Sequence, residues 1–325
     1  MSSSVKVFNT FLGLTIAASI FALLNVHIGW RGYLFDLSAH FSPHLLLLSV
    51  VFGIVLIGDH RWRLAGLFAI VAFLHGAVVL PASMHVSAPL TLVSNANRTL
   101  SIAAANLLGK EASFNKFFTE ASTRQVDLIA VSEAPTGACA LAQAITDVYE
   151  YCFYVDKNDE GKFLSRRIML ILRQPPDEVK AHFDPAFMRR GFIEATFNFD
   201  SEPLSVLIVH PVSPGTPSHL KARDAMLHAV GEVAAASDSE FVVIGDLNTT
   251  PWADIFDVLP GRTVGNPLMH STWLTNFPLI GLPIDHVLIS DRVAATSFEV
   301  GSFNGSDHRP LFTTINIKTD KDLID

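Results

Sequence analysis

Three apolar stretches near the start of the chain constrain its fold more than any other feature. Residues 8–28 run for 21 positions without a formal charge, and residues 64–81 run for 18. A helix needs about 20 apolar residues to cross the hydrocarbon layer of a bilayer. Residues 44–58 reach that length only if their helix begins near Ser38 or Phe41. We therefore expect a transmembrane anchor of about three helices in residues 1–82.

A secretory signal peptide is the alternative for the first stretch, because Lys6 precedes it as a basic start. No small-x-small cleavage pattern follows, and two further apolar stretches come at once. These two features favour the anchor.

Cations in the short loops predict the orientation of the anchor. Lys6 precedes the first stretch, and Arg61 and Arg63 lie between the second and the third. With three spans these positions share a side, which the positive-inside rule makes cytoplasmic. Everything after Pro81 is then predicted to lie on the extracytoplasmic side.

The chain has two cysteines, Cys139 and Cys152, which lie 13 positions apart. They can close a loop in an oxidising compartment, and two buried thiols are the alternative. An extracytoplasmic location favours the disulfide.

The rest of the chain alternates short runs rich in Val, Ile and Phe with helical patterns. Residues 83–98 are a polar linker, and residues 319–325 are a polar tail. Strands are predicted at 99–106, 128–132, 152–155, 168–173, 192–199, 204–209, 241–245, 284–289 and 311–317, and helices at 111–124, 137–148 and 217–236. Several strands follow one another without room for a helix, so hairpins mix with crossovers. An α/β domain with mixed sheets is expected over 99–318.

The charge of this domain bears on its partners. From Leu100 onward the chain has 18 Lys and Arg against 29 Asp and Glu, a balance of −11. Proteins that hold DNA without regard to sequence rely on cationic surface, and runs rich in Lys or Arg are their usual footprint. No such run is present. The overall field therefore opposes the approach of a polyanion.

Polar side chains gather at the ends of the predicted strands, where functional residues of α/β sheets are found. These residues are Asn106, Glu133, His210, Asp246, Asn248, Asp285, Asp307 and His308. Each taken singly is more often a turn former or a satisfied side chain. Together they offer carboxylate and amide oxygens, which suit a hard cation such as Mg²⁺ or Mn²⁺.

The order of these residues resembles the endonuclease/exonuclease/phosphatase superfamily. Its motifs appear as GDLN at 245–248, PIDHVLIS at 283–290 and GSDHRP at 305–310, and the resemblance covers about 99–317. With several spans ahead of them, these motifs are similar to a bacterial membrane-anchored branch. The resemblance implies a four-layer sandwich, in which two mixed β-sheets are flanked by helices. It also implies a multi-pass protein of the bacterial inner membrane.

The resemblance implies a metal site in which Glu133 is the principal Mg²⁺ (or Mn²⁺) ligand. Asn106 and Asp307 support it. No cysteine and histidine spacing typical of structural zinc is present.

The resemblance also implies roles in catalysis. Asp246 orients or deprotonates the attacking water, and Asn248 contacts the phosphate. His308 stabilises the pentacovalent phosphate and is oriented by Asp285, whose carboxylate is expected to raise the pKa of His308. His210 binds phosphate or assists the leaving oxygen.

Three functions remain open. The first is a membrane-anchored phosphoesterase for a phosphate mono- or diester, such as a lipid head group or a small phosphorylated molecule, with the bilayer as a partner through 1–82. The second is an extracytoplasmic nuclease acting on DNA or RNA. The third is a non-catalytic binding protein, although such relatives usually lose the equivalents of Asp246, His308 or Glu133. No protein partner is expected, and Trp252 and Trp273 are expected to pack rather than to shape a substrate pocket.

Overall fold

The structure is a computed structural model that describes residues 3–84, 86–87, 99–157, 163–199, 202–236, 239–277 and 279–317. Contacts group the chain into two compact units. The helical unit contains Met1–His85 and Thr249–Asp257, and the sandwich unit contains Val86–Asn248 and Val258–Asp325. Most of the predicted linker and the whole predicted tail lie outside the described residues.

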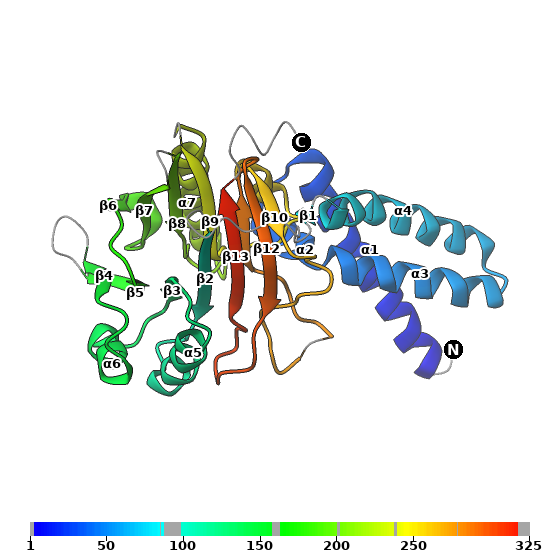
Figure 1. The fold of residues 1–325 in the computed structure, drawn as a ribbon. Helices are drawn as coiled ribbons and strands as arrows, with labels where there is room; N and C mark the ends of the chain where they lie inside the picture. Colours follow the sequence, from blue (N-terminus) through cyan, green and yellow to red (C-terminus); the bar gives the residue numbers. More distant parts are fainter. Residues whose placement is uncertain are drawn as a thin grey trace. The chain divides into compact units, whose positions relative to one another are not determined.

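The helical unit is built from the uncharged stretches (Figure 1). Its helices are α1 (Ser3–Ile28), α2 (Tyr33–Ala39), α3 (Ser42–Gly58) and α4 (Trp62–Met84). By length and composition, Val5–Ile28 and Trp62–Met84 can each cross a membrane. α2 and α3 form a pair bent by 70°, which adds a third candidate if the pair is one span. The expected number of about three is therefore the upper value.

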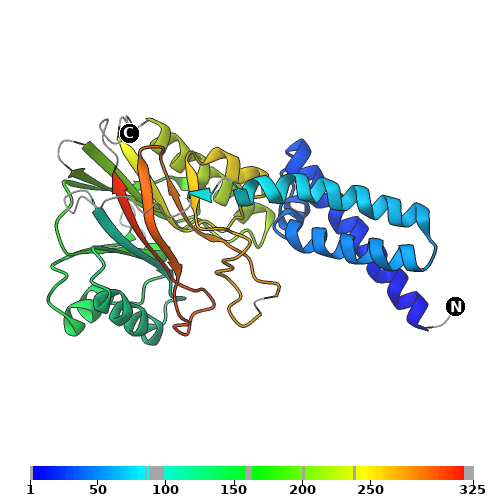
Figure 2. The ribbon, with the colours of Figure 1, turned by 45° about the vertical axis from the view of Figure 1, so that its right-hand side comes forward.

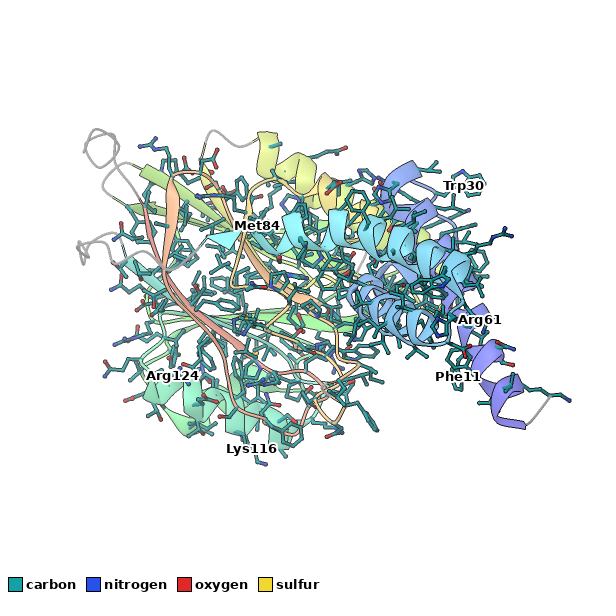
Figure 3. All side chains as sticks on the ribbon, turned by 90° about the vertical axis from the view of Figure 1, so that its right-hand side faces the viewer. Phe11, Trp30, Arg61, Met84, Lys116 and Arg124 are labelled. Carbon is teal, nitrogen blue, oxygen red and sulfur yellow. A yellow bond between two sulfur atoms is a disulfide. The ribbon has the colours of Figure 1, made fainter. Side chains whose placement is uncertain are left out.

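Apolar side chains of the helical unit face outward as well as inward. Leu12, Leu56 and Phe68 form a small buried cluster. Phe11 and Trp30 are more than half exposed (Figure 3). Lipid tails accommodate outward apolar side chains without the cost that water imposes, so this surface is compatible with membrane anchoring.

The segment Thr249–Asp257 belongs to the helical unit although it lies far along the chain. Trp252 is buried, and its indole Nε1 donates to the carbonyl oxygen of His40 at 2.8 Å. Arg31 pairs with Asp254. Trp252 therefore packs, as the sequence suggests.

The sandwich unit contains two mixed β-sheets (Figures 1 and 2). The seven-stranded sheet has the order β1 (Val86–Ser87), β10 (Arg262–Val264), β11 (Asp285–Ile289), β9 (Glu240–Asp246), β8 (Glu202–Ile208), β7 (Gly191–Phe199) and β6 (Glu178–Phe183). The six-stranded sheet has the order β12 (Val293–Val300), β13 (Leu311–Ile317), β2 (Thr99–Asn106), β3 (Leu128–Ser132), β5 (Phe163–Leu172) and β4 (Tyr151–Lys157). Parallel pairs such as β8–β9 and β2–β3 lie among antiparallel ones.

Successive side chains along each strand point to opposite faces of the sheet, and this alternation builds the layers. In β2, Leu100 and Ile102 enter the core between the sheets, and Ala103 enters the core under the helices. This alternation follows from the two-residue period of a strand. Figure 1 shows α5 (Glu111–Thr123) and α6 (Ala138–Ile145) beside the six-stranded sheet, and α7 (Pro217–Ala236) beside β8 and β9. The expected four-layer sandwich is confirmed.

A disulfide joins α6 to β4. It links Cys139 to Cys152, the bond that an extracytoplasmic location favours. The sulfur atoms lie beside the core formed by α5, α6 and the six-stranded sheet. The bond therefore fixes a helix of the outer layer to the edge strand of its sheet.

Candidate functional site

Two aspartates lie opposite each other at one end of the larger sheet. Asp246 ends β9, Asp285 begins β11, and the antiparallel register pairs them directly. Gly245 has a φ of 136°, and a Cβ added there would lie 2.2 Å from the carbonyl oxygen of Val209. Glycine is therefore required for β9 to approach the chain that follows β8.

His308 lies between the two aspartates. Its Nδ1 is 2.8 Å from Oδ2 of Asp285, and its Nε2 is 3.8 Å from Oδ2 of Asp246. All three side chains are buried. The hydroxyl of Thr272 accepts the backbone N–H of Asp285 at 3.1 Å, which fixes the start of β11. Three of the five predicted catalytic residues thus form one buried network of charges.

Burial and charge act in opposite directions on this network. Burial lowers the pKa of His308, but the carboxylates of Asp285 and Asp246 outweigh it and raise the pKa to about 10. Burial raises the pKa of Asp246 above its ordinary value, although His308 opposes this. For Asp285, burial is outweighed by the attraction and hydrogen bond of His308, so its pKa is lowered. At neutral pH His308 is cationic, and Asp246 is the more basic of the two carboxyl groups. The expected rise in the pKa of His308 is confirmed.

The ends of β2 and β3 bring further predicted residues to the same place. These strands are parallel, with Asn106 opposite Ser132, and Glu133 follows at once. The side-chain amide of Asn106 donates to Oδ2 of Asp246 at 2.9 Å. His210 has its Nε2 3.3 Å from Oε1 of Glu133 and its Nδ1 3.5 Å from Oδ2 of Asp246. The imidazole of His210 therefore lies between carboxylates that belong to different sheets.

Two of these residues have an unusual backbone. Glu133 and Asn248 both adopt a φ of 50°, in the left-handed region that residues other than glycine seldom occupy. The N–H of Gly109 donates to the carbonyl of Glu133 at 2.8 Å. The N–H of Asn248 donates to Oδ1 of Asp246 at 2.9 Å, and its side chain donates to the carbonyl of Pro211 at 3.1 Å. Such conformations persist where surrounding contacts hold them, and they are common at functional sites.

Asp307 lies on the loop before β13, and its neighbours tie it to Asn106. The hydroxyl of Ser306 donates to the carbonyl of Asn106 at 2.7 Å and accepts the N–H of His308 at 3.2 Å. The indole Nε1 of Trp273 donates to Oδ2 of Asp307 at 3.3 Å. Trp273 therefore contacts a predicted metal ligand.

Two buried arginines support the loops of the site, and the motifs do not include them. The Nη1 of Arg190 donates to the carbonyls of His210 at 3.4 Å and Pro211 at 3.2 Å. The Nη1 of Arg223 donates to the carbonyl of Asn248 at 3.3 Å. Each guanidinium thus fixes a backbone segment that carries a predicted site residue.

One group of side chains has the spacing of a metal site. The ligand atoms of Asp246, Asp285 and His308 all lie within 4.8 Å of one another. A histidine binds a metal through a nitrogen that carries no proton. Because the pKa of His308 is raised to about 10, both of its nitrogens carry protons at neutral pH. We therefore describe this group as an ion-pair network.

The oxygen-bearing side chains beside this network fit a divalent cation better. Glu133 and Asp307 offer carboxylate oxygens and Asn106 offers an amide oxygen, the donors that Mg²⁺ and Mn²⁺ prefer. Glu133 and Asn106 are buried at adjacent strand ends. The assignment of these three as metal ligands stays a prediction.

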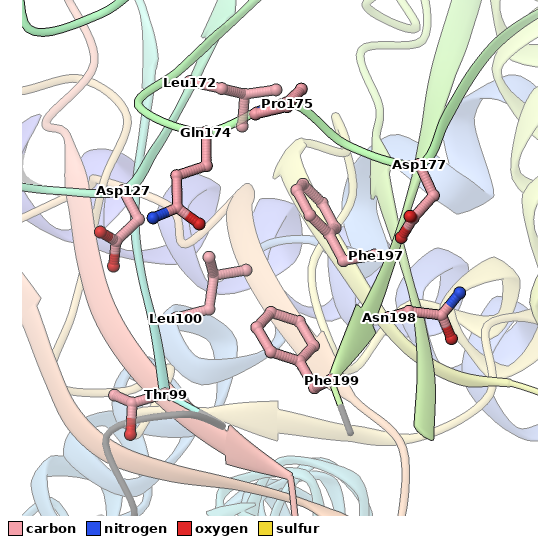
Figure 4. Close-up of a pocket in the computed structure, with 10 residues that line it drawn as sticks. All are labelled: Thr99, Leu100, Asp127, Leu172, Gln174, Pro175, Asp177, Phe197, Asn198 and Phe199. Carbon is pink, nitrogen blue, oxygen red and sulfur yellow. The ribbon is translucent and has the colours of Figure 1, made fainter. Parts of the chain in front are cut away.

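A cavity of about 700 Å³ lies at the opposite end of the strands (Figure 4). Its lining includes Thr99, the first residue of β2, whereas Asn106 at the other end of β2 belongs to the network above. The close-up shows Phe197 and Phe199 facing Leu100 across it. None of the predicted site residues lines this cavity.

Residues 103–308 match the model of the Endonuclease/Exonuclease/phosphatase family. No curated protein matches the chain.

Several solved structures share the fold of the sandwich unit. The crystal structure of a humanized D. rerio TDP2 has a TM-score of 0.56 at 18% identity, covering 67% of this chain and 99% of that one. An endonuclease/exonuclease/phosphatase from Bacteroides vulgatus has a TM-score of 0.54 at 14% identity, covering 68% and 99%. D. rerio TDP2 complexed with single strand DNA product has a TM-score of 0.52 at 17% identity, covering 67% and 99%. These similarities concern the fold.

Proposed function

Because the chain belongs to the endonuclease/exonuclease/phosphatase family, we propose that its sandwich unit hydrolyses a phosphate mono- or diester with a bound divalent cation, Mg²⁺ or Mn²⁺. The observation that carries the proposal is the buried network of Asp246, Asp285 and His308, with its nitrogen–oxygen distances of 2.8 and 3.8 Å. It joins a basic carboxylate to a cationic imidazole, and both are needed for attack of water on phosphorus.

Asp246 orients the attacking water and accepts its proton. Burial makes this carboxylate more basic than an exposed one, which favours proton transfer. The N–H of Asn248 and the amide of Asn106 donate to the two carboxylate oxygens and fix their direction. The side chain of Asn248 contacts the phosphate.

His308 stabilises the charge that develops on the phosphoryl oxygens. Its proton stays in place at neutral pH because Asp285 lies 2.8 Å from its Nδ1. A cation in a buried site interacts with developing negative charge more strongly than it would in water. His210 binds the phosphate or assists the departing oxygen from its position between Glu133 and Asp246.

The divalent cation, when bound, neutralises charge on the phosphate and so favours nucleophilic attack. Glu133 would be its principal ligand, and Asn106 and Asp307 would complete the protein's share of the coordination.

We further propose that the site works at a membrane, on its extracytoplasmic side. The two or three apolar helices support the anchoring. The Cys139–Cys152 disulfide supports an oxidising compartment, since cytosolic thiols are kept reduced. The cations Lys6, Arg61 and Arg63 support the same orientation.

A nuclease is the second candidate. One solved structure with the same fold, D. rerio TDP2, holds a single strand DNA product. The formal net charge of −11 from Leu100 onward opposes the approach of a nucleic acid. We therefore place a lipid head group or a small phosphorylated molecule first.

A hydrolysis panel tests the proposal. The full chain is purified in detergent and assayed with Mg²⁺ against single- and double-stranded DNA, phospholipids and phosphorylated small molecules. We expect turnover of a phosphoester that His308→Gln abolishes while the protein stays folded. Faster turnover of DNA than of the other classes would favour the nuclease, and turnover of no phosphoester would refute the proposal.

A further inference from the structure

Exposed apolar side chains of the sandwich unit gather on two loops. Among the described residues, the loop between β10 and β11 exposes Leu268, Met269, Phe277, Leu279 and Ile280, and the loop between β12 and β13 exposes Phe303. Leu279 is 90% exposed and Met269 is 78% exposed. We call these six residues the apolar rim. Monomeric soluble proteins seldom concentrate large apolar side chains in this way unless the surface binds something.

The apolar rim lies on two loops that lead into part of the candidate site. The first loop leads into Asp285, and the second leads through Asp307 and His308 into β13. Backbone hydrogen bonds join the two loops, from Thr275 N–H to the carbonyl of Asp307 at 3.2 Å and from Arg309 N–H to the carbonyl of Thr272 at 2.8 Å. The rim and the site are therefore parts of one connected structure.

The apolar parts of both loops lack charge in an otherwise acidic domain. Residues 263–284 and 300–306 contain no Asp, Glu, Lys or Arg, whereas the balance from Leu100 onward is −11. His270 belongs to the first loop, and its pKa is lowered by burial and by Arg309, so this side chain stays neutral at neutral pH. Entry of residues 263–284 and 300–306 into an apolar phase therefore desolvates no formal charge.

A lipid bilayer is the apolar phase that the chain itself brings close. α4 is long and apolar enough to span a membrane and ends at Met84, and the sandwich unit begins at Val86. The covalent connection keeps the sandwich unit near a bilayer whenever α4 spans it. Large aliphatic and aromatic side chains on loops also suit insertion among head groups, because each side chain that enters the bilayer surface loses contact with water.

We propose that the apolar rim inserts into the surface of the bilayer and presents the site to phosphoesters held there, so that the substrate class is a lipid head group. The choice of substrate rests on the proposed hydrolytic function, whereas insertion does not.

A single-label experiment tests insertion without any turnover. Because Cys139 and Cys152 are bonded to each other, Leu279→Cys supplies one reactive thiol for the fluorophore NBD. The labelled full chain is reconstituted in phosphatidylcholine nanodiscs with and without doxyl-labelled phosphatidylcholine, which quenches fluorophores that enter the bilayer. The matched control is Val148→Cys, an exposed apolar position on the segment between α6 and β4 and not on the loops of the rim.

We expect the doxyl lipid to quench the label at Leu279 at least about twofold more than the label at Val148. Equal quenching at the two positions would overturn insertion. A blue shift at Leu279 without quenching would also overturn it, because that result means burial against protein, such as a second copy of the chain.

Turnover tests the choice of substrate. The double variant Phe277→Ser with Leu279→Ser is compared with Val148→Ser on phospholipid vesicles and on the water-soluble diester bis(4-nitrophenyl) phosphate. We expect the ratio of lipid to soluble turnover to fall about tenfold in the double variant, since two large apolar contacts with lipid are lost. An unchanged ratio would overturn the role of the apolar rim in presenting the site to lipid. Absence of phospholipid turnover by the unaltered chain would overturn the substrate class, and only absence of turnover across the whole hydrolysis panel would refute the proposed function. The label would still decide insertion in both cases.

Discussion

At the scale of single residues, the two carboxylates beside His308 decide its charge. Burial alone would leave this imidazole neutral, and Asp285 with Asp246 reverses that outcome. The same arrangement leaves Asp285 an anion and makes Asp246 more basic. Because the three groups are buried together, a change in any one of them changes the protonation of the others.

The pH dependence of turnover follows from this coupling. A group whose pKa is raised to about 10 carries its proton at neutral pH and loses it as the pH rises toward that value. Turnover that needs cationic His308 therefore falls on the alkaline side. Asp285→Asn removes the nearest negative charge, so the alkaline limb of the kcat profile should move to lower pH by at least about one unit.

The profile is measured with a water-soluble phosphodiester at constant ionic strength. Asp291→Asn is the control, because the side chain of Asp291 is 95% exposed. Its alkaline limb should lie at the same pH as that of the unaltered chain. If the alkaline limb of the kcat profile of Asp285→Asn lies at the same pH as that of the unaltered chain, His308 is not the titrating group.

The sequence predicts the site residues better than it predicts their supports. Asp246, Asp285 and His308 stand in short motifs, and the structure brings them together. Arg223 stands in no motif, and its only signal is a cation on the same face of a helix as Leu220 and Leu227, which are buried. Its partner, the carbonyl of Asn248, is a backbone atom, and residue types carry no information about such a partner.

At the scale of elements, α7 stabilises the loop after β9 through Arg223. This side chain is fully buried, and it pairs with Asp224 at 2.7 Å in addition to its bond to Asn248. Loss of a buried charged partner is costly because the groups that remain lose their hydrogen bonds in a place that water does not reach.

We expect Arg223→Met to lower the free energy of unfolding by about 2–3 kcal/mol, less than for a fully buried pair because Asp224 is partly exposed. Arg262→Met, at an exposed ion pair, should change it by less than about 0.5 kcal/mol. Urea unfolding of the full chain in detergent, followed by tryptophan fluorescence, measures both. Equal stability of the two variants would contradict the role of Arg223.

The disulfide between α6 and β4 gives a second prediction for elements. Its cysteines are 13 positions apart, and closing a loop of that length stabilises a fold by about 3 kcal/mol through the unfolded state. Cys139→Ser with Cys152→Ser should lower the melting temperature, and dithiothreitol should lower that of the unaltered chain to the same value. If dithiothreitol leaves the melting temperature unchanged, the bond does not stabilise the domain.

The elements predicted from the sequence are those with strong apolar patterns. The predictions at 99–106, 128–132, 311–317 and 217–236 coincide with β2, β3, β13 and α7. The sequence pattern predicts no strand at β1, β6, β10 or β12. β6 and much of β12 are only partly buried and carry few large apolar residues, while β1 and β10 have two and three residues. Such strands depend on pairing with neighbours distant in sequence, which a local pattern cannot reveal.

At the scale of the whole molecule, the orientation in the membrane links the anchor, the disulfide and the substrate. Lys6, Arg61 and Arg63 predict that the sandwich unit lies on the extracytoplasmic side. A C-terminal alkaline phosphatase fusion should therefore be active, and a green fluorescent protein fusion at the same position should be dark. The same reporters inserted after His60, between α3 and α4, should give the reverse pattern. An active phosphatase after His60 would contradict the orientation.

The rate of phosphodiester hydrolysis tests most directly the central claim that water attacks phosphorus beside Asp246. The full chain, Asp246→Asn and the control Asp291→Asn are assayed in detergent with Mg²⁺ and again with EDTA. We predict turnover by the full chain and the control that EDTA abolishes, and a loss of about 10²–10⁴-fold in Asp246→Asn with an unchanged melting temperature. Undiminished turnover by Asp246→Asn, or turnover indifferent to EDTA, would contradict it.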